Sequence, residues 1–203
     1  LSALSITSPR PFASDRDGLG LGEGAAIFCL ERMDDAMKRG AHIYAEISGY
    51  GAATDRHHLT QPHAEGFSAY STMSQSCREA CVTPADIAYL NSHGTGTPLN
   101  DSAEARAICH WAGNAVKPMP VSSTKGNIGH LLGGAGAVES AICLMAMEGR
   151  WIPPGVSVAN PDPVCEFDLV QSPREVSSLP VTLTNSFGFG GSNASLVFKM
   201  FTS

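Results

Sequence analysis

The chain has 203 residues, of which 43% are hydrophobic, and it carries a formal net charge of -6 with an isoelectric point near 5.6. This length and composition can bury a substantial core and fit one domain, or one domain with part of another. The acidic balance, without a cluster of Lys and Arg, argues against a nucleic-acid partner, and Arg150 and Pro153 end the longest apolar run before it reaches membrane-spanning length.

The first third of the chain predicts two strands, a short helix and a loop. Residues 25–31 form a short apolar run bounded by glycine and by charge, and we expect a buried strand there. Residues 32–39 have a helical pattern that ends at Gly40, a usual C-terminal cap. The loose alternation of residues 43–50 predicts a second strand. It leads into a polar loop over 51–62 that is long enough to be functional.

The middle of the chain continues this alternation. Apolar residues recur at helical spacing over 64–81, which predicts an amphipathic helix whose buried face includes Cys77 and Cys81. A proline after a threonine at 83–84 indicates a single helical turn, because proline is harmless at the first helical position. Residues 87–91 then predict a strand.

Asp101 is followed three residues later by Glu104, a spacing typical of a capping box, so we expect a helix that begins here and ends near Gly113. Residues 135–148 are apolar almost all round, which predicts a helix buried in the middle of the fold. Further strands are expected at 119–123, 181–185 and 194–199. The alternation of strands and helices predicts the α/β class.

Two histidines lie in glycine-rich motifs. His93 belongs to Asn-Ser-His-Gly-Thr-Gly-Thr-Pro at 91–98, and His130 ends Ser-Thr-Lys-Gly-Asn-Ile-Gly-His at 123–130. Each closely follows an apolar segment and lies beside a turn in which backbone can approach a ligand. Such a ring nitrogen is suited to binding a carbonyl group, so both histidines are candidate site residues.

Other motifs accompany the histidines: Arg-Pro-Phe and Asp-Arg-Asp-Gly within 10–18, Gly-Glu-Gly-Ala at 22–25, and Asn-Ser-Phe-Gly-Phe-Gly-Gly-Ser-Asn at 185–193. With them, the chain resembles the β-ketoacyl-acyl-carrier-protein synthases of the synthase II type, in the thiolase superfamily. The resemblance implies an α/β thiolase-like fold, a five-layer αβαβα sandwich built from two similar halves. Residues 1–40 would then be the end of the N-terminal half, and residues 41–203 the C-terminal half.

The acyl-accepting cysteine of such synthases is missing. In the family it lies in a short Ala-Cys turn upstream of the region that this chain matches. The cysteines here all lie in apolar or amphipathic segments: Cys29, Cys77, Cys81, Cys109, Cys143 and Cys165. None is a good candidate nucleophile. We therefore expect a C-terminal half of a ketosynthase that has no condensing activity without the N-terminal half.

By the resemblance, His93 and His130 stabilise the enolate that forms when a malonyl group loses carbon dioxide. Two neutral imidazoles, each donating one N–H to the thioester oxygen, stabilise charge that develops only in the transition state. Lys125 and Glu139 match an ion pair beside the site that orients His130. The alternatives are buried histidines that bond to protein carbonyls, and a solvated Lys–Glu surface pair.

The resemblance also implies two mobile loops. Phe189, between Gly188 and Gly190, matches a gating phenylalanine whose backbone N–H is one oxyanion donor, and the glycines let that loop swing. Asp55 and His58 match a second loop that moves with the gate. The alternative for the first loop is a plain hairpin turn with a packed phenylalanine.

Several other functions are disfavoured. The histidines at 57, 58 and 63 lack the regular spacing of metal ligands, so no metal site is expected. The glycine pattern at 20–25 precedes a strand and opens no helix, so we reject dinucleotide binding. A thiolase would carry a second cysteine after Cys165. A chain-length-factor-like or scaffold subunit remains as the alternative, although such subunits usually lose the site residues kept here.

The function that the resemblance implies is decarboxylative condensation of malonyl-acyl carrier protein with an acyl thioester in fatty acid, polyketide or polyene synthesis. The expected partners are an acyl carrier protein, the N-terminal half and a second subunit in a homo- or heterodimer, with no nucleic acid and no membrane. No resident cofactor is expected, because the carrier protein brings its own phosphopantetheine arm. The scattered cysteines suggest reduced thiols and a cytoplasmic location.

Overall fold

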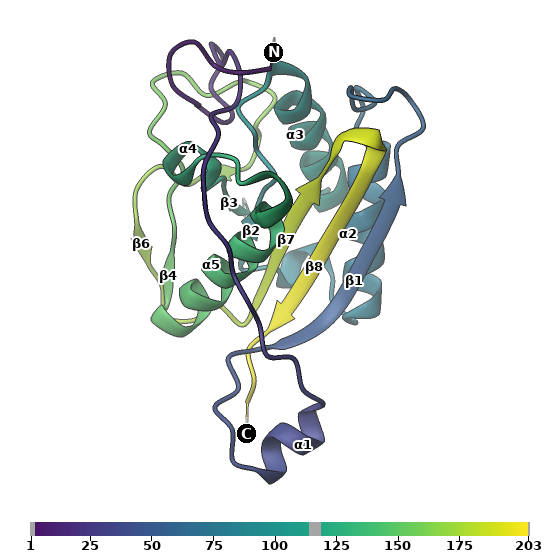
Figure 1. Cartoon of the computed structure of the whole chain (residues 1–203), viewed down its shortest axis with the longest axis vertical. Coiled ribbons are helices and arrows are strands. Elements are labelled where there is room, and N and C mark those ends of the chain that lie inside the picture. The colour runs from purple at the N-terminus through teal and green to yellow at the C-terminus, as the bar shows by residue number, and fades with distance from the viewer. Residues whose placement is uncertain (1–2, 114–118, 203) are drawn as a thin grey trace.

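The computed structural model describes residues 3–113 and 119–202, and a six-stranded mixed sheet lies at its centre (Figure 1). The strands of this sheet are β1 (Glu46–Thr54), β2 (Tyr89–Asn91), β3 (Pro120–Ser122), β5 (Asp168–Leu169), β7 (Val181–Phe187) and β8 (Ser192–Lys199). Their order is β1-β8-β7-β2-β3-β5. Strand β8 is antiparallel to both of its neighbours, and the pairs from β7 to β5 are parallel. The short strands β4 (Trp151–Ile152) and β6 (Arg174–Glu175) pair separately.

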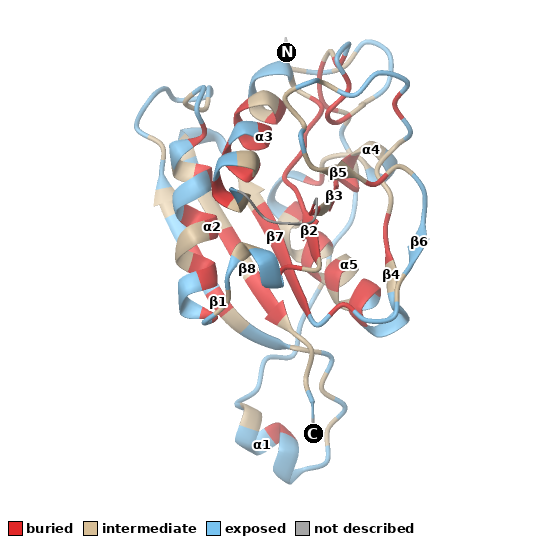
Figure 2. Ribbon diagram, turned by 180° about the vertical axis from the view of Figure 1, so that it is seen from behind, coloured by how far each residue is buried: buried red, intermediate tan, exposed pale blue. Residues whose placement is uncertain are grey.

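Helices cover both faces of the sheet. The α-helices are α1 (Met33–Lys38), α2 (Phe67–Glu79), α3 (Pro98–Ala112), α4 (Lys125–Ile128) and α5 (Ala135–Gly149). Single 3-10 turns lie at Pro84–Asp86, Leu132–Gly134 and Phe189–Gly191. Helices α2 and α3 pack on one face, and α5 packs against β7 on the other (Figures 1 and 2). The chain therefore forms three layers, helix, sheet and helix.

Alternation along β7 divides the core into two clusters. Leu183 packs with α2 and α3 in one cluster. The neighbouring Thr182 points to the opposite face, where its hydroxyl contacts the sulfur of Met147 on α5 at 3.3 Å. Because successive side chains of a strand point to opposite faces, one strand supplies both cores. Figure 2 shows the buried residues concentrated along β7, β8 and the inner faces of the helices.

Helix α2 rests directly on the backbone of β1 at two glycines. A Cβ atom at Gly49 would overlap the carbonyl oxygen of Ser76, and one at Gly51 would overlap that of Thr72. Only glycine permits such a close approach of two backbones. The contact fixes β1 against α2 just before the loop that follows Thr54.

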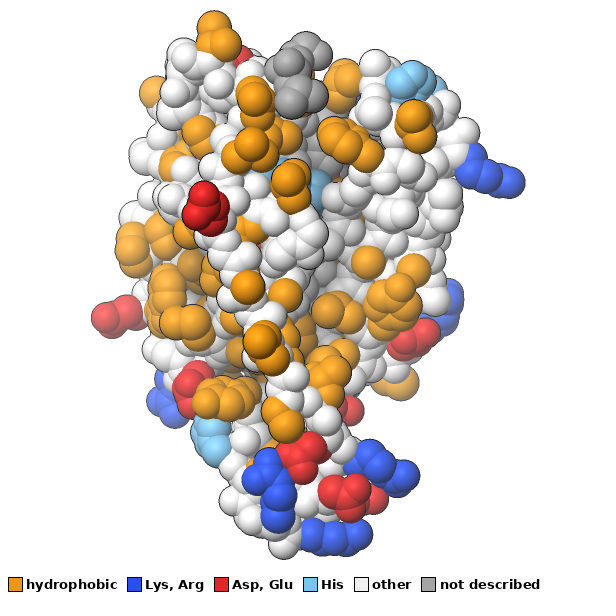
Figure 3. Space-filling model, viewed as in Figure 1, with side chains coloured by type: hydrophobic (Ala, Val, Ile, Leu, Met, Phe, Trp, Pro, Cys, Tyr) orange, Lys and Arg blue, Asp and Glu red, His pale blue; other side chains and the backbone are white. Residues whose placement is uncertain are grey.

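The strand predicted at 25–31 is absent from the described structure. The segment has no strand partner, and Ile27 is 97% exposed. An extended segment needs a neighbouring strand to satisfy its backbone groups, and here it runs past α5 toward α1 instead (Figure 1). Figure 3 shows hydrophobic side chains along this face, with charged side chains gathered at the end where α1 lies.

Other expected elements form with shifted limits. Strand β1 begins three residues later than predicted and takes the first residues of the predicted loop. Helix α2 ends before Cys81, which is exposed in a left-handed conformation, whereas Cys77 is buried as predicted. Helix α5 has the predicted span, but only one side of it is covered here, and Met145 on the other side is 62% exposed. Strands β4, β5 and β6 are too short to leave a periodic pattern, and the prediction missed them.

The contact between α2 and β1 predicts that Gly51→Ala destabilises the protein by about 1–3 kcal/mol, because the added methyl group must displace the backbone of α2. The free energy of unfolding in urea measures this. The matched control is Gly133→Ala, since a Cβ there meets no atom within 4 Å. Equal stabilities of the two variants would contradict the prediction.

Candidate active site

The loops that carry the predicted site residues all leave the same edge of the sheet. Strands β2, β3 and β7 are parallel, so their last residues lie at the same edge of the sheet. These residues are Asn91, Ser122 and Phe187. Strand β1 runs the same way because β8 is antiparallel to both β7 and β1. Ligands of open α/β sheets bind outside the carboxyl ends of strands. The predicted residues in these loops are Asp55, His58, His93, Lys125, His130, Gly188, Phe189 and Gly190.

The two histidines meet edge to face. The ring centroids of His93 and His130 are 5.4 Å apart, and the ring planes make an angle of 84°. His93 is 5% exposed, and the ring of Phe187 lies against it with centroids 5.4 Å apart. Phe187 was missed from the sequence, although its position two residues before the predicted gating phenylalanine was an available signal. His130 is only partly buried, and both histidines line a cavity.

Hydrogen bonding assigns the proton of His130. The backbone N–H of Leu132 donates to Nδ1 at 3.0 Å, so the neutral ring carries its proton on Nε2. Burial and the positive charge of Lys125 lower the pKa of His130 to about 4. Burial, Lys125 and His130 also lower the pKa of His93 well below its ordinary value. Both rings are therefore neutral near pH 7, and each has one N–H to donate.

Lys125 and Glu139 form a buried ion pair. The ammonium of Lys125 bonds to Oε1 of Glu139, and both side chains are 1% exposed. The expected pair is thus present, and the solvated surface pair considered as the alternative is wrong. Burial raises the pKa of Glu139, and the charge of Lys125 opposes this shift. The pair comes from α4 and α5, so it ties the loop that carries His130 to the helix packed on the sheet.

Two buried carboxylates hold the loop that carries His93. Glu104 accepts hydrogen bonds from the backbone N–H groups of His93 and Gly94, both at 2.8 Å. Asp101 accepts from the N–H groups of Thr95, at 3.0 Å, and of Gly96. The expected capping box is therefore wrong. Helix α3 begins at Pro98, and the two carboxylates, one turn apart on its buried face, bond to a different segment.

The two predicted mobile loops contact each other through backbone hydrogen bonds. Gly190 donates its N–H to the carbonyl of Leu59, and Asp55 donates its N–H to that of Gly191, both at 2.7 Å. The carboxylate of Asp55 accepts from the N–H groups of His57 and His63 at 3.1 and 2.7 Å, which folds its own loop. His58 accepts the N–H of Thr60 on Nδ1 at 3.1 Å. Thus Asp55 joins the two loops, whereas the hydrogen bonds of the His58 ring to described residues stay within its own loop.

Phe189 does not pack within this chain. It is 71% exposed at the tip of the loop, between Gly188 and Gly190, and the latter has a positive φ. A plain hairpin with a packed phenylalanine is therefore wrong for the described residues. The two loops, both histidines and the start of α3 enclose a cavity of about 700 Å³. The polar residues that line it include His93, Thr95 and His130.

The glycines of residues 20–25 serve a local role. The carbonyl of Gly20 accepts the N–H of His130 at 2.7 Å, and Gly22 donates its N–H to the carbonyl of His130 at 3.1 Å. This extended segment therefore supports the loop that carries His130 and opens no helix.

Among the described residues, no three His, Cys, Asp or Glu side chains are grouped to hold a metal ion. None of the helices in residues 3–113 and 119–202 combines the length and apolar character needed to cross a membrane.

Comparison with known proteins agrees with this fold and site. The family model described as Beta-ketoacyl synthase, C-terminal domain, matches residues 44–159. The 3-oxoacyl-[acyl-carrier-protein] synthase 2 of Synechocystis sp. is 42% identical over 196 residues, which cover 97% of this chain and 47% of that protein. The enzyme of the same name from Staphylococcus aureus is 44% identical over 197 residues, covering 96% and 47%. The chain thus spans about half the length of the curated relatives it matches.

Solved structures give the same assignment. The ishigamide ketosynthase/chain length factor aligns with a TM-score of 0.93 at 34% identity, covering 99% of this chain and 49% of that one. A beta-ketoacyl synthase from Burkholderia phymatum aligns with a TM-score of 0.90 at 35% identity, covering 99% and 50%. A type II polyketide ketosynthase solved with its acyl-carrier protein, AntDE:AntF, aligns with a TM-score of 0.90 at 29% identity, covering 100% and 50%. The chain belongs to the β-ketoacyl synthase family, as its C-terminal domain, and the predicted α/β thiolase-like fold is confirmed.

The effect of the Lys125 charge on the pKa of His130 can be tested by removing that charge. Removing the ion pair with the double variant Lys125→Met/Glu139→Gln, which leaves no unpaired buried charge, is expected to raise the pKa of His130 from about 4 toward 6.5. NMR titration of the imidazole signals measures this, with His130→Asn assigning the resonance. Lys199→Met, far from the site, is the control. An unchanged pKa in the double variant would contradict the argument.

The same pKa has a consequence for stability. The unfolded His130 titrates near 6.5 and the folded one near 4, so the unfolded state binds more protons between these values. Protonation of His130 therefore does not change the free energy of unfolding above pH 6.5. As the pH falls from 6.5 toward 4, the proton bound by the unfolded state lowers that free energy.

Proposed function

We propose that this chain supplies the malonyl-activating part of a β-ketoacyl-acyl-carrier-protein synthase, whose acyl-accepting cysteine lies outside residues 1–203. The observation that carries the proposal is the pair of neutral imidazoles, His93 and His130, which meet in the lining of one cavity. Two N–H donors with depressed pKa values can bind a carbonyl oxygen without giving up a proton. An enolate requires that form of stabilisation.

The reaction would proceed in two steps. In the first, the carbon–carbon bond to the malonyl carboxylate breaks and carbon dioxide leaves. The electron pair of that bond moves into an enolate, whose oxygen accepts a hydrogen bond from each of the two imidazole N–H groups. The enolate carbon then attacks the acyl thioester on the cysteine, and the thiolate leaves. Donors already aimed at the developing charge lower the barrier, because no reorganisation is needed at the moment of reaction.

Lys125 supports this role by helping to keep the histidines neutral. Burial, and after it the positive charge of Lys125, disfavours protonation of both rings. An imidazolium would protonate the enolate or hold the malonyl carboxylate, and either would slow condensation. Lys125 and Glu139 are positioning residues in this scheme, because neither has to touch the substrate.

The loop of Phe189 would act as the gate, and the loop of Asp55 would move with it. Their three backbone contacts support this coupling: two hydrogen bonds and the close approach of Gly191 to the carbonyl of Asp55. The N–H of Phe189 would supply one oxyanion donor and the N–H of the cysteine the other. Because Phe189 is exposed on this chain alone, its pocket would be formed with the complementary half.

The proposed partners are an acyl carrier protein, the N-terminal half and a second subunit of a homo- or heterodimer. The relative AntDE:AntF, solved with its acyl-carrier protein, and the ketosynthase/chain length factor relatives support these kinds of partner. The carrier brings the phosphopantetheine arm, so no resident cofactor is needed. A cytoplasmic location stays a prediction from the cysteines. The division at residues 40 and 41 also stays a prediction.

The first test is made in the complete synthase formed by this chain and its N-terminal half. His93→Asn and His130→Asn are each expected to slow malonyl decarboxylation by about 100-fold or more, because each removes one donor to the enolate. Acylation of the cysteine should change much less. Carbon dioxide release and acyl-enzyme mass measure the two steps. His42→Asn, on the surface beside Glu148, is the control. Full decarboxylation in both site variants would overturn the proposal.

A second test uses the chain by itself. Purified without the complementary half, it is expected to give no condensation product from malonyl- and acyl-carrier protein, because none of its cysteines lines the cavity that contains the two histidines. Burial raises the pKa of Cys77 and Cys165 to about 12 and makes those thiols poor nucleophiles. Adding the N-terminal half should restore product formation. Turnover by the chain alone would contradict the assignment.

A further inference from the structure

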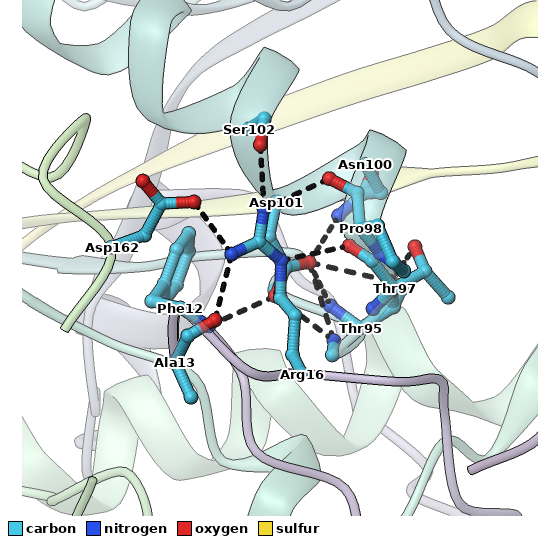
Figure 4. A network of polar contacts seen from close by, with 12 residues as sticks. Phe12, Ala13, Arg16, Thr95, Thr97, Pro98, Asn100, Asp101, Ser102 and Asp162 are labelled. Atoms are coloured by element: carbon cyan, nitrogen blue, oxygen red, sulfur yellow. Dashed lines mark hydrogen bonds and ion pairs between the residues drawn. The ribbon is translucent and has the colours of Figure 1, made fainter. Parts of the chain in front are cut away.

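Arg16 is buried where three segments meet, although it lies in an irregular loop. The residue is 8% exposed, and Figure 4 shows its guanidinium enclosed by the start of α3, by Ala13 and by Asp162. Its five donor contacts are Nε to Thr97 O (3.2 Å), Nη1 to Ala13 O and Asp162 Oδ2 (both 2.7 Å), and Nη2 to Pro98 O (2.9 Å) and Ser102 Oγ (2.5 Å). These contacts use the full donor capacity of an arginine, which a lysine cannot reproduce.

Two of these acceptors lie at the end of the loop that carries His93. The carbonyls of Thr97 and Pro98 stand where this loop becomes α3. Gly94 and Gly96 within the loop both have positive φ, at 31° and 84°, a backbone conformation that residues other than glycine rarely adopt. An anchor at the C-terminal end of the loop helps to hold this conformation in place.

Asp101 provides a second link from Arg16 to the same loop. Its Oδ2 lies 3.8 Å from Nε of Arg16. Its carboxylate accepts the N–H groups of Thr95, Gly96 and Phe12, as Figure 4 shows in part. Burial raises the pKa of Asp101, and the positive charge of Arg16 opposes that rise and favours the ionised form that these donors need.

We propose that Arg16 is a positioning residue that acts through Asp101 and the carbonyls of Thr97 and Pro98 to hold the ring of His93 opposite His130. The proposal rests on the proposed function of the two histidines and goes beyond it, because Arg16 lies on a separate loop and touches neither ring. Misplacing a reacting group by about 1 Å costs about 100-fold in rate. Arg16 should therefore affect the step that needs His93 and leave the step that needs only the cysteine.

The experiment measures the two half-reactions in the complete synthase. Arg16→Met is expected to slow malonyl decarboxylation by about 10- to 100-fold, with cysteine acylation changed by less than about threefold. Arg16→Lys keeps the charge and loses the fork, so it should show a smaller loss of the same selective kind. The control is Arg174→Met, which removes an arginine paired with Asp168 on the surface and should alter neither step.

Both outcomes are decisive. Normal decarboxylation in folded Arg16→Met would overturn the proposal, and so would parallel loss of both half-reactions, which indicates a purely structural residue. If Arg16→Met fails to fold by circular dichroism, Arg16→Lys decides by the same criteria.

The route through Asp101 is tested with a double-mutant cycle. If Arg16 acts through this carboxylate, Arg16→Lys should slow decarboxylation less in an Asp101→Asn background than in the wild type. Independent effects of the two substitutions would overturn that route.

If the wild-type synthase performs neither half-reaction, the proposed function fails. The inference is then decided by the NMR ring signals of His93, which should shift in Arg16→Lys and stay in place in Arg174→Met.

Discussion

The geometry of the site depends on two carboxylates buried beneath the loop that carries His93. Burying a carboxylate without partners costs several kcal/mol, so Asp101 and Glu104 must be matched by donors. The donors are successive backbone N–H groups of one loop, and therefore α3 and this loop can adopt only one mutual arrangement. Glu104 also accepts from Asn185 on β7 at 3.1 Å, which extends the constraint to the strand that precedes the turn with Phe189.

The polar residues at the ends of the strands form a layer that is distinct from the two apolar cores. Residues such as Leu183 and Met147 stabilise the chain through apolar burial on either side of the sheet. The buried Lys125–Glu139 pair gives little net stability after its desolvation. Burial, together with the charge of Lys125, lowers the pKa of both histidines. The fold thus uses its apolar layers for stability and its polar layer for position and charge.

Local patterns in the sequence predicted the α/β class, and the resemblance to the β-ketoacyl synthases brought His93, His130, Lys125 and Glu139 into one site. Asp101 and Glu104 were misinterpreted, since their spacing imitates a capping box and their true partners come from a loop above the helix. Periodicity could not predict the fate of residues 25–31. An apolar run indicates a tendency to be buried, but the run alone does not show which neighbouring element would bury it.

The hairpin of β7 and β8 limits how far the proposed gate could move. Its ladder pairs residues continuously from Val181 and Lys199 to Phe187 and Asn193, so the strands form a stiff stem up to the turn. Beyond this pairing Gly188 still donates its N–H to the carbonyl of Ser192 at 2.7 Å, which leaves the short turn Phe189–Gly191 outside the ladder. Opening of the proposed gate would therefore be a short flap rather than a hinge of the sheet. It should have a small activation entropy and leave the protected amides of the stem unexchanged.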